Sequence, residues 1–235
     1  MGKVRFSVSV SLDGYMAGPD QSDENPLGVG GMGLHRWLFD MGAWRASHGE
    51  TGGRVDASSR VANDLEAGFG AVVMGRNMFS PTRGDWGEHY WRGWWGDNPP
   101  YHTPVFVLTH HRRESLEMEG GTTFHFVTDG AESALNQANT AAGDDDVLIA
   151  GGASVIRQYF AAGVIDEFWL SVVPLFLGSG ERLLDGLPGG VEIDLEEVVA
   201  APIVTHHKYA LRLPARSVGS AWEEDYRSVS CHPRR

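Results

Sequence analysis

The spacing of hydrophobic and polar positions changes along the chain, and each spacing predicts a kind of element. Residues 4–10 are rich in β-branched side chains and end at the turn pair Asp13-Gly14, which predicts a first strand. Two short helices follow, and Asp56 or Ser58 could cap the second of them. Their buried faces are predicted from apolar side chains at helical spacing, which are Leu34, Trp37, Leu38 and Met41, then Val61, Leu65 and Phe69. The glycine- and polar-rich stretch 42–53 is predicted to connect the two helices.

Strands and helices alternate through the rest of the chain. Short apolar strands are predicted at residues 71–74, 105–108, 124–127, 147–150 and 168–173. One helix is predicted at 131–142 and another after Gly151-Gly152, and two more regularly alternating strands follow at 192–200 and 204–213. This order predicts an α/β fold of three α/β/α layers, with a mainly parallel central sheet and an antiparallel C-terminal edge. We expect one domain over residues 1–213 and a polar tail, 214–235, that is loose or packed on a partner.

Composition narrows the classes of function. The formal net charge of -12 argues against a general nucleic-acid surface, because phosphate binding needs clustered Lys and Arg. The single cysteine, Cys231, excludes an intrachain disulfide. No apolar run approaches the roughly 18 residues of a membrane span, and we expect a cytoplasmic protein that binds neither nucleic acid nor membrane.

Three turns between a strand and the segment after it could carry chemistry. In an open α/β sheet, ligands bind where the carboxyl ends of strands meet helix amino termini. Gly151-Gly152 could expose amides to an anion, or could simply form a tight turn. Arg76, after Gly75, could hold a phosphate or pair with an acidic neighbour. Residues 109–112 offer a hydroxyl, two imidazoles and a guanidinium, or are a solvated loop.

Two other classes of enzyme are disfavoured. The adjacent His206 and His207 lie in a predicted strand and therefore point to opposite faces. No HExxH motif and no paired CxxC occurs, so no metal site is predicted. A serine hydrolase is disfavoured because the GxSxG elbow is absent.

Five segments in their order along the chain resemble the dihydrofolate-reductase-like superfamily. They are residues 8–18 (VSVSLDGYMAG), 73–77 (VMGRN), 105–109 (VFVLT), 147–160 (VLIAGGASVIRQYF) and 165–184 (IDEFWLSVVPLFLGSGERLL). The branch they resemble most is the reductase domain of the riboflavin-biosynthesis deaminase/reductase and its stand-alone bacterial relatives. The resemblance covers residues 4–213 and implies an NADPH-binding reductase.

The resemblance also implies which residues meet NADPH. Ala17 and its neighbours would line the nicotinamide, and Thr109 with His110 would lie near the adenosine 2′-phosphate. The phosphates would be bound by Gly75, Arg76 and Asn77, and the pyrophosphate by Gly151, Gly152, Ala153, Ser154 and Val155. The bond between Gly151 and Gly152 is a candidate for a cis peptide, as in other such folds.

The chain departs from the superfamily in three ways. The carboxylate that dihydrofolate reductases carry three residues before a tryptophan is Leu34 here, before Trp37. A threonine often found three positions after the strand-end glycine is Met78. The fused deaminase domain that the riboflavin enzyme usually carries is not expected within residues 1–235. We therefore expect hydride transfer to a C=N or C=O group of a small pterin- or pyrimidine-like substrate, the alternative being a non-catalytic nucleotide- or pterin-binding protein.

Catalytic and substrate-binding residues are predicted less sharply. Asp13 could contact substrate or merely form an Asx turn, and Ser171 could touch the substrate. Asp40, His35 and an ordered water are further proton-source candidates. Leu34 and Trp37 are predicted at the substrate. The tryptophans could form a stacking wall or lid, a core, or the surface of a homodimer, and they are Trp37, Trp44, Trp86, Trp91, Trp94 and Trp95.

Overall fold

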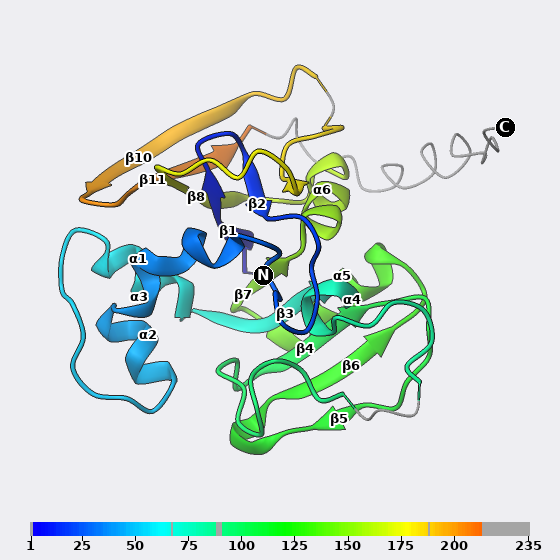
Figure 1. Ribbon diagram of the computed structural model, residues 1–235. Helices are drawn as coiled ribbons and strands as arrows, with labels where there is room; N and C mark the ends of the chain where they lie inside the picture. The colour runs from blue at the N-terminus through cyan, green and yellow to red at the C-terminus, as the bar shows by residue number, and fades with distance from the viewer. Residues whose placement is uncertain (1, 67, 88–90, 188, 213–235) are drawn as a thin grey trace, which may run out of the picture.

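A nine-stranded sheet runs through the centre of the protein (Figure 1). The computed structural model describes residues 2–66, 68–87, 91–187 and 189–212. Along the sheet, the strands are β10 (Ile193–Ala201), β11 (Val204–Leu211), β8 (Glu167–Val173), β1 (Val4–Ser11), β7 (Asp146–Gly151), β3 (Phe69–Gly75), β4 (Pro104–Leu108), β6 (Thr123–Val127) and β5 (Leu116–Glu117). The short strands β2 (Tyr15–Ala17) and β9 (Glu181–Arg182) pair with each other beside it.

The pairing confirms the predicted α/β fold class. The six strands from β8 to β6 are parallel, and β10 and β11 form the antiparallel edge that follows them. The other edge is antiparallel too, because β5 pairs with β6 in the opposite direction. Sequence patterns missed β5, β2 and β9, since strands of two or three residues are too short to show a period.

The helices are η1 (Gly31–His35), α1 (Arg36–Phe39), α2 (Gly42–Ser47), α3 (Ser59–Glu66), α4 (Arg76–Phe79), η2 (Glu119–Gly121), α5 (Ala131–Ala142) and α6 (Ala153–Ala161). Two predictions were wrong. Phe69 opens β3 instead of continuing α3, because Gly68 between them has a φ of 81° that breaks the helix. The stretch predicted as a connection contains α2.

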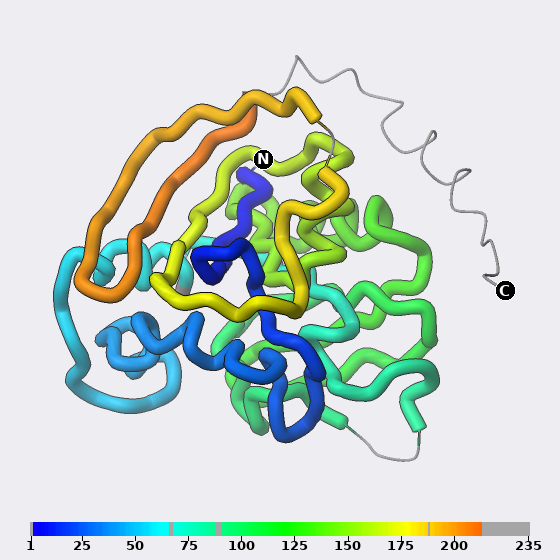
Figure 2. The backbone as a smooth tube through the Cα atoms, turned by 45° about the horizontal axis from the view of Figure 1, so that its top comes forward, coloured from blue at the N-terminus to red at the C-terminus, as the bar shows by residue number. Residues whose placement is uncertain are grey.

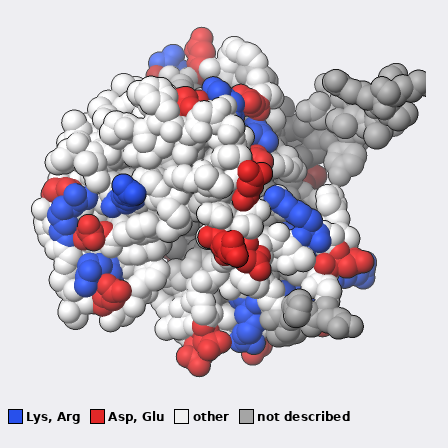
Figure 3. Space-filling view, viewed as in Figure 1, with Lys and Arg blue, Asp and Glu red and all other residues white. Residues whose placement is uncertain are grey.

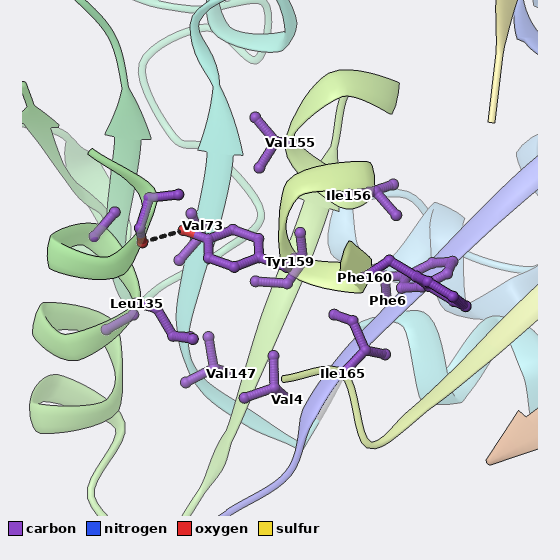
Figure 4. Close-up of a cluster of buried hydrophobic side chains, with 14 of the residues drawn as sticks. Val4, Phe6, Val73, Leu135, Val147, Val155, Ile156, Tyr159, Phe160 and Ile165 are labelled. Atoms are coloured by element: carbon purple, nitrogen blue, oxygen red, sulfur yellow. Dashed lines mark hydrogen bonds between the residues drawn. The ribbon is translucent and has the colours of Figure 1, made fainter. Parts of the chain in front are cut away.

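One face of the sheet is covered by α5 and α6. Apolar side chains from both helices pack on β1, β3 and β7, and Figure 4 shows Tyr159 of α6 at the centre of this layer. The Tyr159 hydroxyl donates to the carbonyl oxygen of Ala131 at 2.8 Å, which joins α6 to the start of α5. Burial raises the pKa of Tyr159, so this hydroxyl keeps its proton.

The opposite face carries two separate apolar clusters. The α1–α3 cluster covers β8 and β11, and it contains Leu34, Trp37, Leu38, Met41, Val61, Ala62, Trp169, Val173 and Val204. The α4 cluster covers β3 and β4, and it contains Val72, Met74, Phe79, Val105, Val107, Leu116, Met118, Phe124 and Leu148. Between them lies β1, whose side chains alternate so that Phe6 and Val8 join the α5 and α6 layer. Ser7 and Ser9 therefore face the space between the two clusters.

The first loop is joined to a segment far away in the sequence. Residues 174–187, yellow in Figure 2, run beside the blue chain that follows β1. The amide of Leu12 donates to the carbonyl of Leu175 at 2.9 Å, and β2 pairs with β9. This contact closes one side of the space above β1.

The surface charges of the described residues show no segregation by sign on the face seen in Figure 3. On the face shown in Figure 3, Lys and Arg side chains are scattered among Asp and Glu. In the part of the chain that the structure describes, no helix is both long and apolar enough for a membrane span. The predicted tail, 214–235, and Leu213 of the predicted last strand lie outside the described residues.

Candidate functional site

A cavity of about 1550 Å³ occupies the space between the two apolar clusters. Its wall includes the residues that follow β3, β4, β6 and β7, so it lies at the carboxyl edge of the parallel strands. The predicted cofactor residues all line it, and they are Ala17, Gly75, Arg76, Asn77, Thr109, His110, Gly151, Gly152, Ala153, Ser154 and Val155. The fold thus brings together turns that are far apart in sequence.

The turn after β7 begins at two glycines joined by a cis peptide bond, as the resemblance implies. Gly151 has a φ of 131°, a conformation that favours glycine. A Cβ on Gly75 would lie 2.8 Å from Cγ2 of Val155, so the turns after β3 and β7 approach closely. Helix α6 starts at Ala153, and its first two residues, Ala153 and Ser154, line this part of the cavity, where the amino terminus of a helix favours an anion.

Arg76 brings a buried positive charge to the same wall. The Nε, Nη1 and Nη2 atoms are buried, and none has a hydrogen-bond partner among the described residues. Its guanidinium carbon lies 3.3 Å from the ring centroid of Trp86, so the group stacks on the indole face. Burial lowers the pKa of Arg76, and the charges of Arg113 and Arg83 lower it further. A buried cation without a carboxylate partner is the donor set that a phosphate group completes.

The third turn is only partly buried. Thr109 is buried, and its Oγ1 accepts a hydrogen bond from the amide of His111 at 3.2 Å. His110 is exposed at the mouth of the cavity. Nδ1 of His111 lies 2.6 Å from Oδ1 of Asp85, which ties this turn to the segment after α4.

The inner end of the cavity is built from hydroxyls and rings. Ser9 of β1 and Ser171 of β8 both line it, together with Trp37. Nε1 of Trp37 donates to Oγ of Ser9 at 2.9 Å. Oγ of Ser171 lies 2.8 Å from Nδ1 of His206, whose Nε2 lies 2.9 Å from Oγ of Ser58.

His35 adds one more imidazole to this end. It lines the cavity, and its Nδ1 is buried with no hydrogen-bond partner among the described residues. Burial lowers the pKa of His35 to about 4, against a smaller opposing effect of the Gly31 carbonyl. The ring is therefore neutral at pH 7, where Nδ1 or Nε2 can accept a hydrogen bond.

Asp13 does not line the cavity. Its carboxylate accepts from the hydroxyl of Ser11 at 2.6 Å, and from the amides of Leu177 and Gly178 at 3.1 and 2.7 Å. These bonds, above all the one from Ser11, lower the pKa of Asp13 to about 2. Its contacts are those of a loop-shaping residue, and its predicted catalytic role stays a prediction.

Two further candidates lie away from the cavity wall. Leu34 is completely buried in the α1–α3 cluster and does not line the cavity, and its predicted contact with the substrate stays a prediction. Asp40 is exposed just beyond α1 and does not line the cavity either. Neither position supplies a carboxylate to the inner end.

The tryptophans divide between core and cavity. Trp86, Trp91 and Trp95 pack against the α4 cluster. Their neighbours fix them, since Nε1 of Trp86 donates to the carbonyl of His111 at 3.0 Å and Nε1 of Trp91 to that of Phe79 at 2.7 Å. The cavity is lined by Trp37, Trp44, Trp94 and Trp95. The tryptophans of residues 86–95 thus contribute both to the core and to the cavity wall.

Comparison with known proteins agrees with this architecture. The RibD C-terminal domain matches residues 2–203. The chain belongs to the RibD C-terminal domain family. The uncharacterized protein YyaP of Bacillus subtilis (strain 168) is 26% identical over 116 residues, which are 48% of this chain and 57% of that protein. The chain thus matches little more than half the length of this relative.

Two solved structures share the fold of this protein. A putative riboflavin biosynthesis protein from Shewanella sp. PV-4 has a TM-score of 0.56 at 21% identity, covering 91% of this chain and 100% of that one. A deaminase and 5-amino-6-(5-phosphoribosylamino)uracil reductase from Thermotoga maritima has a TM-score of 0.52 at 13% identity, covering 89% and 56%. The dihydrofolate-reductase-like fold is thereby confirmed.

Sequence reasoning missed three polar residues of the inner end, which are Ser9, Ser58 and His206. Ser9 could have been found, since serines at 7, 9 and 11 alternate with apolar residues in β1 and must share one face. His206 was considered only as a metal ligand. Ser58 was considered only as a helix cap, and no pattern in the sequence links it to a residue 148 positions away.

Proposed function

We propose that this protein is an NADPH-dependent reductase that transfers hydride to a C=N or C=O carbon of a small pterin- or pyrimidine-like substrate. The observation that carries the proposal is the Arg76 guanidinium, whose buried nitrogens have no hydrogen-bond partner among the described residues, in a residue that lines the large cavity. Membership of the RibD C-terminal domain family supports it. The structural neighbour from Thermotoga maritima, which is a deaminase and 5-amino-6-(5-phosphoribosylamino)uracil reductase, supports it too.

The residues present fit a phosphorylated dinucleotide. Arg76 offers two edges of N–H donors for a phosphate, and Asn77 follows it on the wall. Gly151, Gly152 and the amides at the start of α6 suit a pyrophosphate, because glycine lets the backbone approach closely. Thr109 and His110 are proposed near the 2′-phosphate and Ala17 near the nicotinamide.

The chemistry divides between the cofactor and the protein. NADPH, when bound, supplies the hydride. The protein orients the substrate against it and excludes water from the inner end, where Trp37 and Ser171 line the wall. Ser171 is proposed to contact the substrate atom that gains charge, since it is the hydroxyl of β8 that reaches the cavity.

A titration followed by an activity screen tests the proposal. NADPH and NADH are titrated separately into the protein while its thermal unfolding is followed, and NADPH is expected to raise the Tm more. NADPH oxidation is then followed at 340 nm with dihydrofolate, 5-aminouracil derivatives and cyclic imines. Stabilisation without oxidation of NADPH by any substrate would favour the non-catalytic binder. The absence of stabilisation by NADPH would contradict the proposal altogether.

A further inference from the structure

Two serines sit side by side at the inner end of the cavity. Ser9 of β1 pairs with Ser171 of the parallel neighbour β8. Both are buried, with 6% and 1% of their surface exposed, and both line the cavity. Adjacent strands are about 4.8 Å apart, so the two hydroxyls can contact one small molecule together.

The direction of the first hydroxyl follows from its partner. Nε1 of Trp37 is 2.9 Å from Oγ of Ser9. An indole N–H is only a donor, so Ser9 accepts this bond and keeps its own proton for another acceptor. No acceptor for the Ser9 proton is found among the described residues, and Ser9 lines the cavity. The proton is therefore available to a ligand in the cavity.

The direction of the second hydroxyl follows from a buried chain of three groups. His206 is fully buried, with Ser171 at its Nδ1 and Ser58 at its Nε2. Ser58 is fully buried too, and its hydroxyl has no other hydrogen-bond partner among the described residues. If Nε2 carried the proton, the Ser58 proton would be left without an acceptor, which costs about 1–3 kcal/mol in a buried site.

The hydrogen bonds of this chain therefore favour one direction, from Ser58 through His206 to Ser171. Ser58 donates to Nε2, the Nδ1–H group donates to Ser171, and the Ser171 proton is left for the cavity. Burial keeps the imidazole neutral by lowering the pKa of His206 to about 4, so that one of its nitrogens can accept. The rings of Trp37 and His206 pack edge to face at 4.6 Å, which braces the two donors against each other.

We infer that Ser9 and Ser171 form a pair of hydroxyl donors that binds hydrogen-bond acceptors of the substrate, and that His206 is the positioning residue that makes Ser171 a donor. Among the described residues, no carboxylate lines this end near the two serines, so at the positions that the two hydroxyls reach the site selects carbonyl oxygens over amino groups. This inference rests on the proposed function for the identity of the ligand as a substrate. The hydrogen-bond chain itself can be tested without any ligand.

The tautomer of His206 is the first test. Histidine labelled with ¹⁵N is incorporated, and the signals of His206 are assigned with the variant His206→Asn. We expect a protonated Nδ1 and an unprotonated Nε2 at pH 7. Ser58→Ala removes the donor to Nε2 and is expected to produce a mixture of both tautomers. A protonated Nε2 in the unsubstituted protein would overturn the inference, since Ser171 would then have to donate to His206.

Ligand polarity is the second test. Two probes of the same shape, 5,6-diaminouracil and 2,4,5,6-tetraaminopyrimidine, are titrated into the protein with NADPH present. We expect the carbonyl-bearing probe to bind at least about tenfold more tightly, since one unpaired polar contact costs about that factor. Ser9→Ala and Ser171→Ala are each expected to remove most of this preference while leaving NADPH binding unchanged.

Variants of His206 and His207 distinguish a positioning role of His206 from a general effect on folding. His206→Asn places an N–H near the position of Nδ1 and is expected to keep the preference, whereas His206→Phe loses it. His207→Asn is the matched control, because His207 is on the other face of β11 and contacts Tyr209. Equal binding of the probes, the reverse preference, or no binding of either overturns the inference. A lack of NADPH binding instead contradicts the proposed function, while the tautomer test still decides the direction of the chain.

Discussion

The two ends of the cavity satisfy their polar groups in different ways. At the phosphate end, formed by Arg76 and the Gly151-Gly152 turn, a buried guanidinium has no hydrogen-bond partner among the described residues. At the hydroxyl end, formed by Ser9, Ser171 and the rings behind them, both nitrogens of His206 and the nitrogen of Trp37 are hydrogen-bonded. The first end holds a charge that a ligand would satisfy. The second, apart from the unpaired Nδ1 of His35, is a hydrogen-bonded network of the protein itself.

This difference predicts a difference in the effect of mutations. An unpaired buried charge destabilises the free protein, so removing it costs ligand binding and little stability. A satisfied buried network contributes to stability, so breaking it leaves unpaired groups behind. Mutations at the phosphate end should therefore change ligand affinity, and mutations at the hydroxyl end should change the free energy of unfolding.

The largest effect is expected for His206→Leu. The variant fills most of the ring volume but leaves the hydroxyls of Ser58 and Ser171 without their partner, which costs about 3 kcal/mol of unfolding free energy. Urea unfolding followed by tryptophan fluorescence measures it, with His207→Leu as the control on the other face of β11. NADPH affinity should stay the same. A stable His206→Leu variant would show that the network contributes nothing to the fold.

Arg76→Ala is expected to affect the phosphate end, where it should weaken ligand binding. Loss of a charge-assisted contact should weaken NADPH binding by about 2 kcal/mol, or roughly thirtyfold, with the Tm of the ligand-free protein nearly unchanged. NADH binding should change little if Arg76 contacts the 2′-phosphate. Isothermal titration with both cofactors distinguishes the roles, and the exposed Arg112 supplies the control Arg112→Ala. Equal losses for both cofactors would instead assign Arg76 to the pyrophosphate.

Acid should weaken the hydroxyl end first. The pKa of His206 is lowered to about 4 by burial, so as pH falls below the unfolded value of 6.5 the unfolded chain binds a proton that the folded one does not. Stability is therefore lost as pH falls from about 7 toward 4, by about 2 kcal/mol at pH 5 for this group. Unfolding curves of the protein and of His206→Asn at pH 7 and pH 5 measure it, and the variant should lose less. Identical losses would place the titrating group elsewhere.

The smallest effect is expected for Asp13→Asn, outside both ends. The pKa of Asp13 is lowered to about 2, so its stabilising effect is complete above its unfolded value near 4 and disappears as pH falls through 2. The Tm of the variant should be slightly lower than that of the protein at pH 7 and equal to it near pH 2. NADPH oxidation should be unaffected. An unchanged Tm with a large loss of kcat would restore the catalytic role predicted for Asp13.

Much of the phosphate end could be predicted because its signals are local. A glycine pair after an apolar strand, or Gly75-Arg76 after another, can be read within a few residues, and parallel strands bring such turns to one edge. Local spacing places Leu34 near Trp37, and the structure puts both side chains in the α1–α3 cluster, where Trp37 also lines the cavity and Leu34 does not. The predicted contact of Leu34 with the substrate stays a prediction.

The sequence by itself determined the order of the longer strands and helices, the α/β fold and the glycine turns at its carboxyl edge, because hydrophobic periodicity and backbone freedom are properties of short segments. Only the tertiary structure decided that the Arg76 guanidinium has no hydrogen-bond partner among the described residues and that Asp13 braces a loop. Only it joined Ser171, His206 and Ser58 into one chain. A hydrogen bond depends on distances of a few ångströms between atoms, and the fold alone sets those distances for residues 35 and 148 positions apart.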